Sequence, residues 1–153
     1  MLLVNKKLNS MKVFIENQAE SNQKNIYNEK TLEYKETFTV SREYPFPYGF
    51  VLNTTNADGD NLDCFIITAK DLKTGQIIDC EPIGMMEQTE DGKEDNNILA
   101  KLSGEEVIVD NSVIKKLTEF IAHVFDYRAG KIVKVGRFLD KLEAEKYINK
   151  CLD

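Results

Sequence analysis

Three aspartates, Asp58, Asp60 and Asp63, lie within six residues, close enough for all three carboxylates to face one site. Carboxylates this close repel one another unless a cation lies between them, and Gly59 lets the backbone turn tightly. Carboxylate oxygens are also the ligands that hard divalent cations prefer. The spacing therefore predicts a metal site. The alternative is an ordinary polar turn, because Asn, Asp and Gly are turn residues as well.

An EF-hand calcium loop does not explain this cluster. Such a loop needs a side-chain oxygen ligand at its fifth position, glycine at its sixth and glutamate at its twelfth. Those positions hold Leu62, Asp63 and Ala69. Asp63 also lies at the start of an apolar strand, where a carboxylate needs a partner. Its position favours the metal site over the polar turn.

The composition of the whole chain narrows the class of protein. Its 153 residues are enough for one domain spanning 1–153, and 20 basic against 26 acidic residues give a charge of −6. That charge argues against nucleic acid or an anionic membrane surface as partner. No stretch has the ~20 apolar residues of a membrane span, and the apolar start at 1–4 is too short for a signal peptide. Three widely spaced cysteines predict reduced thiols and a cytoplasmic protein.

The elements that must position the aspartates are short strands. Apolar runs predict strands at 48–53 and 63–69 on either side of the cluster, with others at 31–38, 77–86, 97–102 and 131–138. Helical spacing after Asp110 predicts a helix capped by Asn111 or Ser112. The stretch 140–143 resembles a capping box that opens a last helix. This order predicts a β-rich α+β protein, a small barrel or sandwich with two C-terminal helices.

Two tyrosines upstream make the aspartate pattern more specific. Tyr-Pro-x-x-Tyr-Gly at 44–49, followed by Asp-Gly-Asp-x-x-Asp at 58–63, resembles the family I (soluble) inorganic pyrophosphatases. The likeness extends to Ile-Gly-Met-Met at 83–86 with Glu-Asp at 94–95, and to 121–128, which ends in Tyr-Arg. The resemblance implies a small distorted five-stranded barrel, similar to an oligonucleotide-binding fold, with two C-terminal helices. It also implies a cytoplasmic homo-oligomer.

The activity that this resemblance implies is that of an inorganic diphosphatase. Pyrophosphate would be hydrolysed to two phosphates with several Mg²⁺ ions per site, or with Mn²⁺ in their place. Asp60 would be the general base that takes a proton from the attacking water. The metal ligands implied are Asp58, Asp63, Asp95, Glu90 and Glu16. The substrate-binding residues implied are Lys24, Lys35, Tyr48, Tyr127 and Arg128.

Some positions depart from the family pattern. Ile26 stands where a second acidic residue follows Lys24, and Asn97 stands where a lysine follows Asp95. The family pattern also implies a phosphate-binding arginine before the tyrosines, and the basic residues available for that role are Lys35 and Arg42. These departures leave a second hypothesis open: a divergent homologue that binds metal and an anion with weak, absent or altered-substrate activity. A third, an oligonucleotide-binding barrel, needs a basic aromatic face that this acidic chain lacks.

Overall fold

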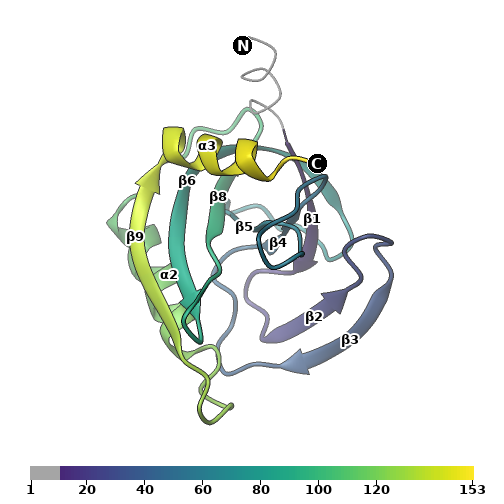
Figure 1. The fold of residues 1–153 in the computed structure, drawn as a ribbon, viewed down its shortest axis with the longest axis vertical. Coiled ribbons are helices and arrows are strands. Elements are labelled where there is room, and N and C mark those ends of the chain that lie inside the picture. Colours follow the sequence, from purple (N-terminus) through teal and green to yellow (C-terminus); the bar gives the residue numbers. More distant parts are fainter. Residues whose placement is uncertain (1–10) are drawn as a thin grey trace.

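The computed structural model describes residues 11–153, and five of its strands close into a barrel (Figure 1). Strand β1 pairs with both β4 and β6, which joins the two edges of the sheet that runs through β5 and β8. Closure removes the unpaired edges that an open sheet would expose. The five strands are β1 (Met11–Asn17), β4 (Tyr48–Val51), β5 (Asp63–Ile66), β8 (Asn97–Leu102) and β6 (Ile77–Glu90).

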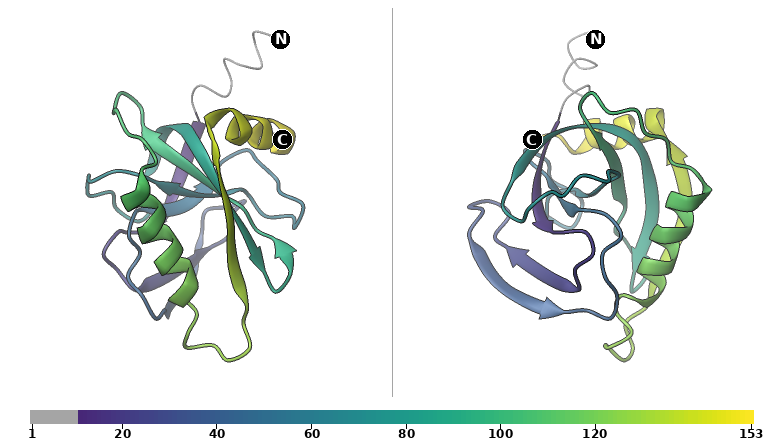
Figure 2. Two further views of the ribbon diagram at one scale, coloured as in Figure 1. Left: turned by 90° about the vertical axis from the view of Figure 1, so that its left-hand side faces the viewer. Right: turned by 180° about the vertical axis from the view of Figure 1, so that it is seen from behind.

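The remaining elements surround this barrel. A separate two-stranded hairpin consists of β2 (Gln23–Tyr27) and β3 (Tyr34–Thr39). Strands β7 (Lys93–Glu94) and β9 (Val133–Asp140) both pair with β6. Helices α2 (Asn111–His123) and α3 (Lys141–Cys151) lie on different sides of the barrel (Figure 2). The expected barrel with two C-terminal helices is therefore confirmed.

Alternation along the strands produces two separate apolar clusters, because successive side chains point to opposite faces. In β5, Cys64 and Ile66 belong to the first cluster, whereas Phe65 belongs to the second. The first cluster also contains the buried residues of α3, and the second contains those of α2. Each helix thus covers apolar surface that the sheet would otherwise expose.

Both helices begin at an aspartate cap. Asp140 Oδ1 accepts a hydrogen bond of 3.1 Å from the Glu143 N–H, as the capping box predicts. The first helix begins one residue earlier than expected, because Asp110 rather than Asn111 or Ser112 accepts the N–H of Val113 at 3.0 Å. A carboxylate three residues before a free N–H satisfies it directly, so Asp110 takes the cap position.

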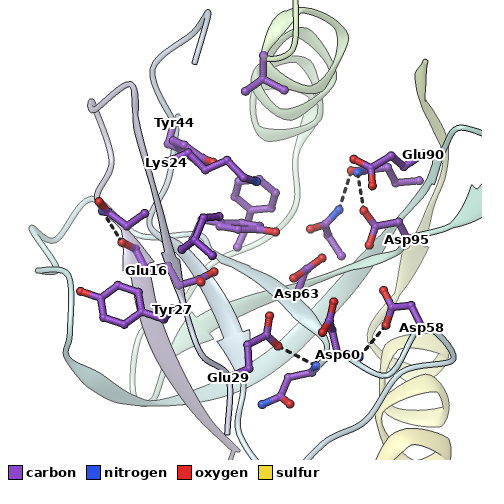
Figure 3. A pocket seen from close by; sticks show the side chains of 18 of the residues that line it. Glu16, Lys24, Tyr27, Glu29, Tyr44, Asp58, Asp60, Asp63, Glu90 and Asp95 are labelled. Carbon is purple, nitrogen blue, oxygen red and sulfur yellow. Dashed lines mark hydrogen bonds between the residues drawn. The ribbon is translucent and has the colours of Figure 1, made fainter. Parts of the chain in front are cut away.

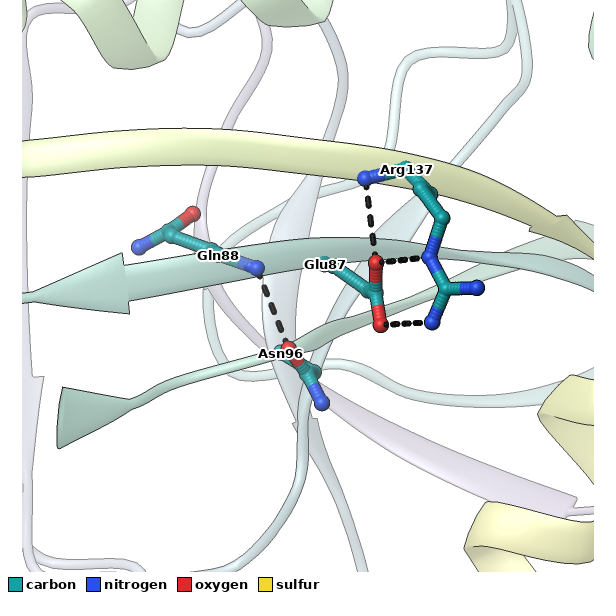
Figure 4. Close-up of polar contacts among 4 residues, drawn as sticks. All are labelled: Glu87, Gln88, Asn96 and Arg137. Atoms are coloured by element: carbon teal, nitrogen blue, oxygen red, sulfur yellow. Dashed lines mark hydrogen bonds and ion pairs between the residues drawn. The ribbon is translucent and has the colours of Figure 1, made fainter.

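Strand β9 is fastened to β6 where the register of the pair shifts, between Met86 and Gln88 (Figure 4). Arg137 donates to both carboxylate oxygens of Glu87, at 2.8 Å and 2.9 Å. The N–H of Gln88 donates to Asn96 Oδ1 at 3.0 Å. These contacts tie β9 and the residue that precedes β8 to β6 at this point.

The apolar start at residues 1–4 lies outside the described residues. Within 11–153, neither helix has the length and apolar character needed to span a bilayer.

Candidate active site

A cavity of about 570 Å³ opens beside the loop between β4 and β5. Residues from β1, the β2–β3 hairpin, that loop, β6, β8 and the end of α2 line it. Figure 3 shows side chains from these separate elements directed into the same space. Most of the site residues expected from the sequence are brought together here: Glu16, Lys24, Lys35, Tyr48, Asp58, Asp60, Asp63, Glu90 and Asp95.

Tyr127 and Arg128 are not among the residues that line this cavity. They follow the end of α2, where Tyr127 is 48% exposed and its backbone N–H donates to Ser41 Oγ at 3.0 Å. Arg42 also lies outside the cavity lining and donates to the carbonyl of Ser41, whereas Lys35 lines the cavity. Of the two basic residues that the sequence offers for binding phosphate, Lys35 is therefore the one that reaches the cavity.

The aspartate loop is folded by short local hydrogen bonds. Asp58 Oδ1 accepts the N–H of Asp60 at 3.0 Å, and Gly59 between them has a φ of +89°, which favours glycine. At the end of the loop, Thr54 Oγ1 accepts the N–H of Leu62 at 3.0 Å, and Leu62 is completely buried. The buried leucine anchors the loop, so the carboxylates on either side of it face outward into the cavity.

The glycine of the Tyr-Gly pair allows β4 to approach β1. A Cβ atom at Gly49 would lie 1.7 Å from the carbonyl oxygen of Phe14, far inside contact distance. Any other residue would therefore push the strands apart. This close approach places Tyr48 at the cavity wall, opposite Phe65 of β5.

Asp63 and Asp95 form a close carboxyl pair at the base of the site. Burial, the charge of Asp95 and a hydrogen bond to it raise the pKa of Asp63 well above its ordinary value. Burial also raises the pKa of Asp95, although its hydrogen bond with Asp63 acts in the opposite direction. Two carboxyls this close titrate as a pair, and burial shifts their titration to higher pH.

Two glutamates, Glu16 and Glu29, line another part of the same cavity. Burial, followed by the charge of Glu29, raises the pKa of Glu16 from 4.5 to about 8. Burial likewise raises the pKa of Glu29 to about 7. Glu29 was not expected from the sequence, because it lies in a polar turn 32 positions before its partner. Glu29 Oε1 accepts the N–H of Asn61 at 2.8 Å, and no short-range sequence motif predicts this contact.

Asn97 stands where the family pattern has a lysine, and its buried amide is linked to Asp95 through Gln88. Asn97 Nδ2 donates to Gln88 Oε1 at 2.7 Å, and Gln88 Nε2 donates to Asp95 Oδ2 at 3.3 Å. Asn97 is only 2% exposed. A neutral chain of amides thus orients Asp95, with no cation at this position.

Glu90 lines the cavity, but its carboxylate is already paired. Lys131 Nζ lies 2.6 Å from Glu90 Oε1 and 4.3 Å from the centre of the Phe125 ring. Lys24 Nζ approaches the same ring at 5.4 Å. The aromatic ring therefore holds two ammonium groups beside the acidic cavity. A metal ion at Glu90 would have to compete with Lys131.

The donor set of the cavity fits hard divalent cations. Asp58, Asp63 and Asp95 offer carboxylate oxygens only, and burial raises the pKa of the last two. Within residues 11–153, no three acidic, cysteine or histidine side chains meet tightly enough to form an all-protein metal cage. Mg²⁺ does not need one, because it keeps several waters and binds through one or two carboxylates.

The raised pKa values of Glu16 and Glu29 predict that the metal-free protein loses stability as the pH rises. A carboxyl whose pKa is higher in the folded state binds its proton more tightly there, so its protonation favours folding at low pH. For Glu16 this advantage is lost as the pH rises from 4.5 through about 8. We expect the free energy of unfolding in EDTA to fall by on the order of 2 kcal/mol between pH 5.5 and 8.5.

Urea unfolding at the two pH values measures this difference. Glu16→Gln should flatten the dependence, whereas Glu33→Gln, in an exposed turn, should leave it unchanged. A wild-type stability that stays constant or rises over this pH range would contradict the assignment of a buried, protonated Glu16.

Comparisons with known proteins identify the family of this chain. The family model described as inorganic pyrophosphatase matches residues 13–153. An inorganic pyrophosphatase of Nanoarchaeum equitans is 34% identical over 150 residues, which cover 90% of this chain and 92% of that protein. One from Agrobacterium fabrum is 35% identical over 120 residues, covering 72% of this chain and 68% of that protein.

Solved structures show the same fold. An inorganic pyrophosphatase from Thermus thermophilus superposes with a TM-score of 0.87 at 22% identity, covering 94% of this chain and 89% of the other. One from Neisseria gonorrhoeae superposes with a TM-score of 0.86 at 25% identity, covering 95% of this chain and 90% of the other.

Proposed function

This chain belongs to the inorganic pyrophosphatase family, and we propose that its acidic cavity hydrolyses pyrophosphate to two phosphates with the help of Mg²⁺. The observation that carries this proposal is the gathering of Asp58, Asp60, Asp63 and Asp95 in one cavity that Lys24 and Lys35 also line. Carboxylates suit divalent cations, and ammonium groups suit phosphate oxygens. A polyanionic substrate of pyrophosphate size needs both.

We assign the principal metal ligands to Asp58, Asp63 and Asp95, with Glu16 facing the substrate from the opposite wall. Mg²⁺, or Mn²⁺ in its place, would neutralise charge on the phosphates and lower the pKa of water when bound. Because burial raises the pKa of Asp63 and Asp95, a bound cation would favour the ionised form of both carboxyls. Glu90 has a supporting role in this proposal, because its carboxylate holds Lys131 at the edge of the site.

Asp60 is proposed as the general base. Burial and the charge of Asp58 raise its pKa, although the side chain itself remains exposed to the cavity. A carboxylate with a raised pKa accepts a proton more readily, and exposure lets an attacking water reach it. The proton of that water would move to the Asp60 carboxylate as the water attacks phosphorus.

The phosphate groups would be held by Lys24, Lys35 and the hydroxyl of Tyr48. Burial and the charge of Asp63 raise the pKa of Tyr48 well above its ordinary value, so this hydroxyl stays protonated and can donate. Tyr127 and Arg128 are proposed as contacts at the rim of the cavity, next to Phe125. Homo-oligomeric assembly and a cytoplasmic location stay predictions, the latter supported by three buried, unpaired cysteines.

A phosphate-release assay on the purified protein tests this proposal. With pyrophosphate and millimolar Mg²⁺ we expect turnover, and excess EDTA should lower the rate by at least about 100-fold. An aryl phosphomonoester at the same concentration serves as the control substrate and should release little phosphate. Equal rates with and without EDTA would contradict the metal requirement.

The second hypothesis, a homologue that binds without efficient turnover, is favoured by one observation. Asn97 and Gln88 place neutral amides where the family pattern has a cation, so charge on the transferred phosphoryl group is less well stabilised in the transition state. The same assay separates the two hypotheses. Calorimetric binding of Mg²⁺ and pyrophosphate with negligible phosphate release would favour the second.

A further inference from the structure

The end of helix α3 is attached to the loop that carries the aspartates, although the two are far apart in the sequence (Figure 1). The N–H of Thr55 donates to the carbonyl of Cys151 at 2.8 Å, and the N–H of Asp153 donates to the carbonyl of Asn53 at 3.1 Å. Thr55 Oγ1 also donates to Asp153 Oδ1 at 2.6 Å. The C-terminal segment therefore supports the aspartate loop from outside the cavity lining.

A single side chain of this helix connects two acidic loops. The hydroxyl of Tyr147 lies 3.0 Å from Asn56 Oδ1 and 3.1 Å from Glu94 Oε1. Asn56 belongs to the aspartate loop, two residues before Asp58, and Glu94 directly precedes Asp95. A hydroxyl has one proton, so Tyr147 shares it between these two acceptors. Its contacts thus join the segments that present Asp58 and Asp95.

The ring of Tyr147 is well placed to hold this hydroxyl still. The residue is only 8% exposed and packs in the first apolar cluster with Ala144, Ile148 and Cys151. A buried ring on a helix loses little further freedom when its hydroxyl forms hydrogen bonds. The hydrogen bonds of Tyr147 therefore hold both loops in a fixed position relative to α3.

We propose that Tyr147 is a positioning residue that sets the distance between the loops carrying Asp58 and Asp95. The proposal rests on the proposed function, in which both aspartates bind divalent cations. Like-charged carboxylates separate when nothing holds their loops, and bringing them together again costs free energy at the moment a cation binds. A fixed spacing in the metal-free protein removes that cost. Tyr147 touches neither metal nor substrate in this role.

Tyr147→Phe tests this inference, because it removes only the hydroxyl and keeps the buried ring. Mg²⁺ binding to the full chain, measured by calorimetry without substrate, should weaken by about three- to ten-fold, as expected for losing hydrogen bonds of ordinary strength. The Mg²⁺ concentration that gives half-maximal phosphate release should rise by a similar factor, whereas kcat at saturating Mg²⁺ should change little.

Two controls separate positioning from simple loss of stability. Ile148→Val removes a buried methylene from the same helix and should lower the thermal midpoint without changing Mg²⁺ affinity. Tyr34→Phe removes an exposed hydroxyl, bonded to Thr37 Oγ1, and should change neither quantity. If Tyr147→Phe lowers the thermal midpoint but binds Mg²⁺ as the wild type does, the role is structural and the inference is wrong.

A thermodynamic cycle with Glu94→Ala supplies a second test. Two residues that act through one contact have non-additive effects. Tyr147→Phe should therefore weaken Mg²⁺ binding less in the Glu94→Ala background than in the wild type, and full additivity would count against the inference. Absence of Mg²⁺ binding by the wild type would overturn the proposed function itself. The two failures are thus distinguishable.

Discussion

Replacing Asp60 by Asn will lower phosphate release from pyrophosphate by about 10²- to 10⁴-fold, the usual contribution of a general base. The amide has almost the same shape as the carboxylate but cannot accept a proton. Asp60 is exposed to the cavity, and its backbone N–H, rather than its side chain, makes the bond to Asp58. The loop should therefore keep its fold, and the thermal midpoint should stay close to that of the wild type.

The rate is best measured at saturating Mg²⁺, so that a change in metal affinity does not resemble a loss of chemistry. Asp71→Asn is the matched control, since Asp71 is an exposed aspartate paired with Lys73 outside the cavity lining. It should keep normal turnover. Near-normal turnover of Asp60→Asn would assign proton transfer to another group.

Replacing Asp63 by Asn will have opposite effects on stability and on metal binding. The metal-free protein should gain about 1–2 kcal/mol in the free energy of unfolding at pH 8, because a buried carboxylate beside Asp95 is removed. Mg²⁺ binding should weaken by about 100-fold or more, because affinity follows the number of charged ligands. The residue is thus expected to be costly for folding and necessary for the cation.

Urea unfolding in EDTA measures the first effect, and calorimetric titration with Mg²⁺ measures the second. Asp79→Asn provides the control, because Asp79 is a largely exposed aspartate that pairs with Lys12 on the outside of the barrel. It should leave Mg²⁺ affinity unchanged. A destabilised Asp63→Asn protein that still binds Mg²⁺ normally would show that this carboxylate serves the fold rather than the cation.

Local features were predictable from the chain itself, because they depend on neighbours a few residues apart. The strands on either side of the aspartates and the capping box at Asp140 both follow such short-range rules. The cap at Asp110 was missed by one residue, which is the usual precision of a helix boundary. The barrel itself followed from the number and shortness of the strands together with the family resemblance.

Contacts between distant segments were not predictable in this way. Glu29, in the turn between β2 and β3, accepts a hydrogen bond from the N–H of Asn61. Lys131 forms an ion pair with the carboxylate of Glu90. Gln88 orients Asp95 through a hydrogen bond, and it can do so because the pairing of β6 with β8 places it beside Asn97. Each of these partners is chosen by how the strands pair, and no spacing within one segment encodes that choice.

The sequence by itself determined the chemistry of this protein: a set of carboxylates whose spacing within one short loop suits divalent cations, beside tyrosines suited to phosphate. Only the tertiary structure decided which residues share the cavity. It placed Lys35 and Glu29 in the cavity lining and left Tyr127 and Arg128 outside it. It also brought the hydroxyl of Tyr147, which lies outside the lining, to Asn56 and Glu94 in the loops behind the site. The physical reason is that the types and spacing of the carboxylates within one loop are written in the sequence. The distances from these carboxylates to other side chains, and their pKa values, depend on burial and on neighbours that only the closed barrel brings together.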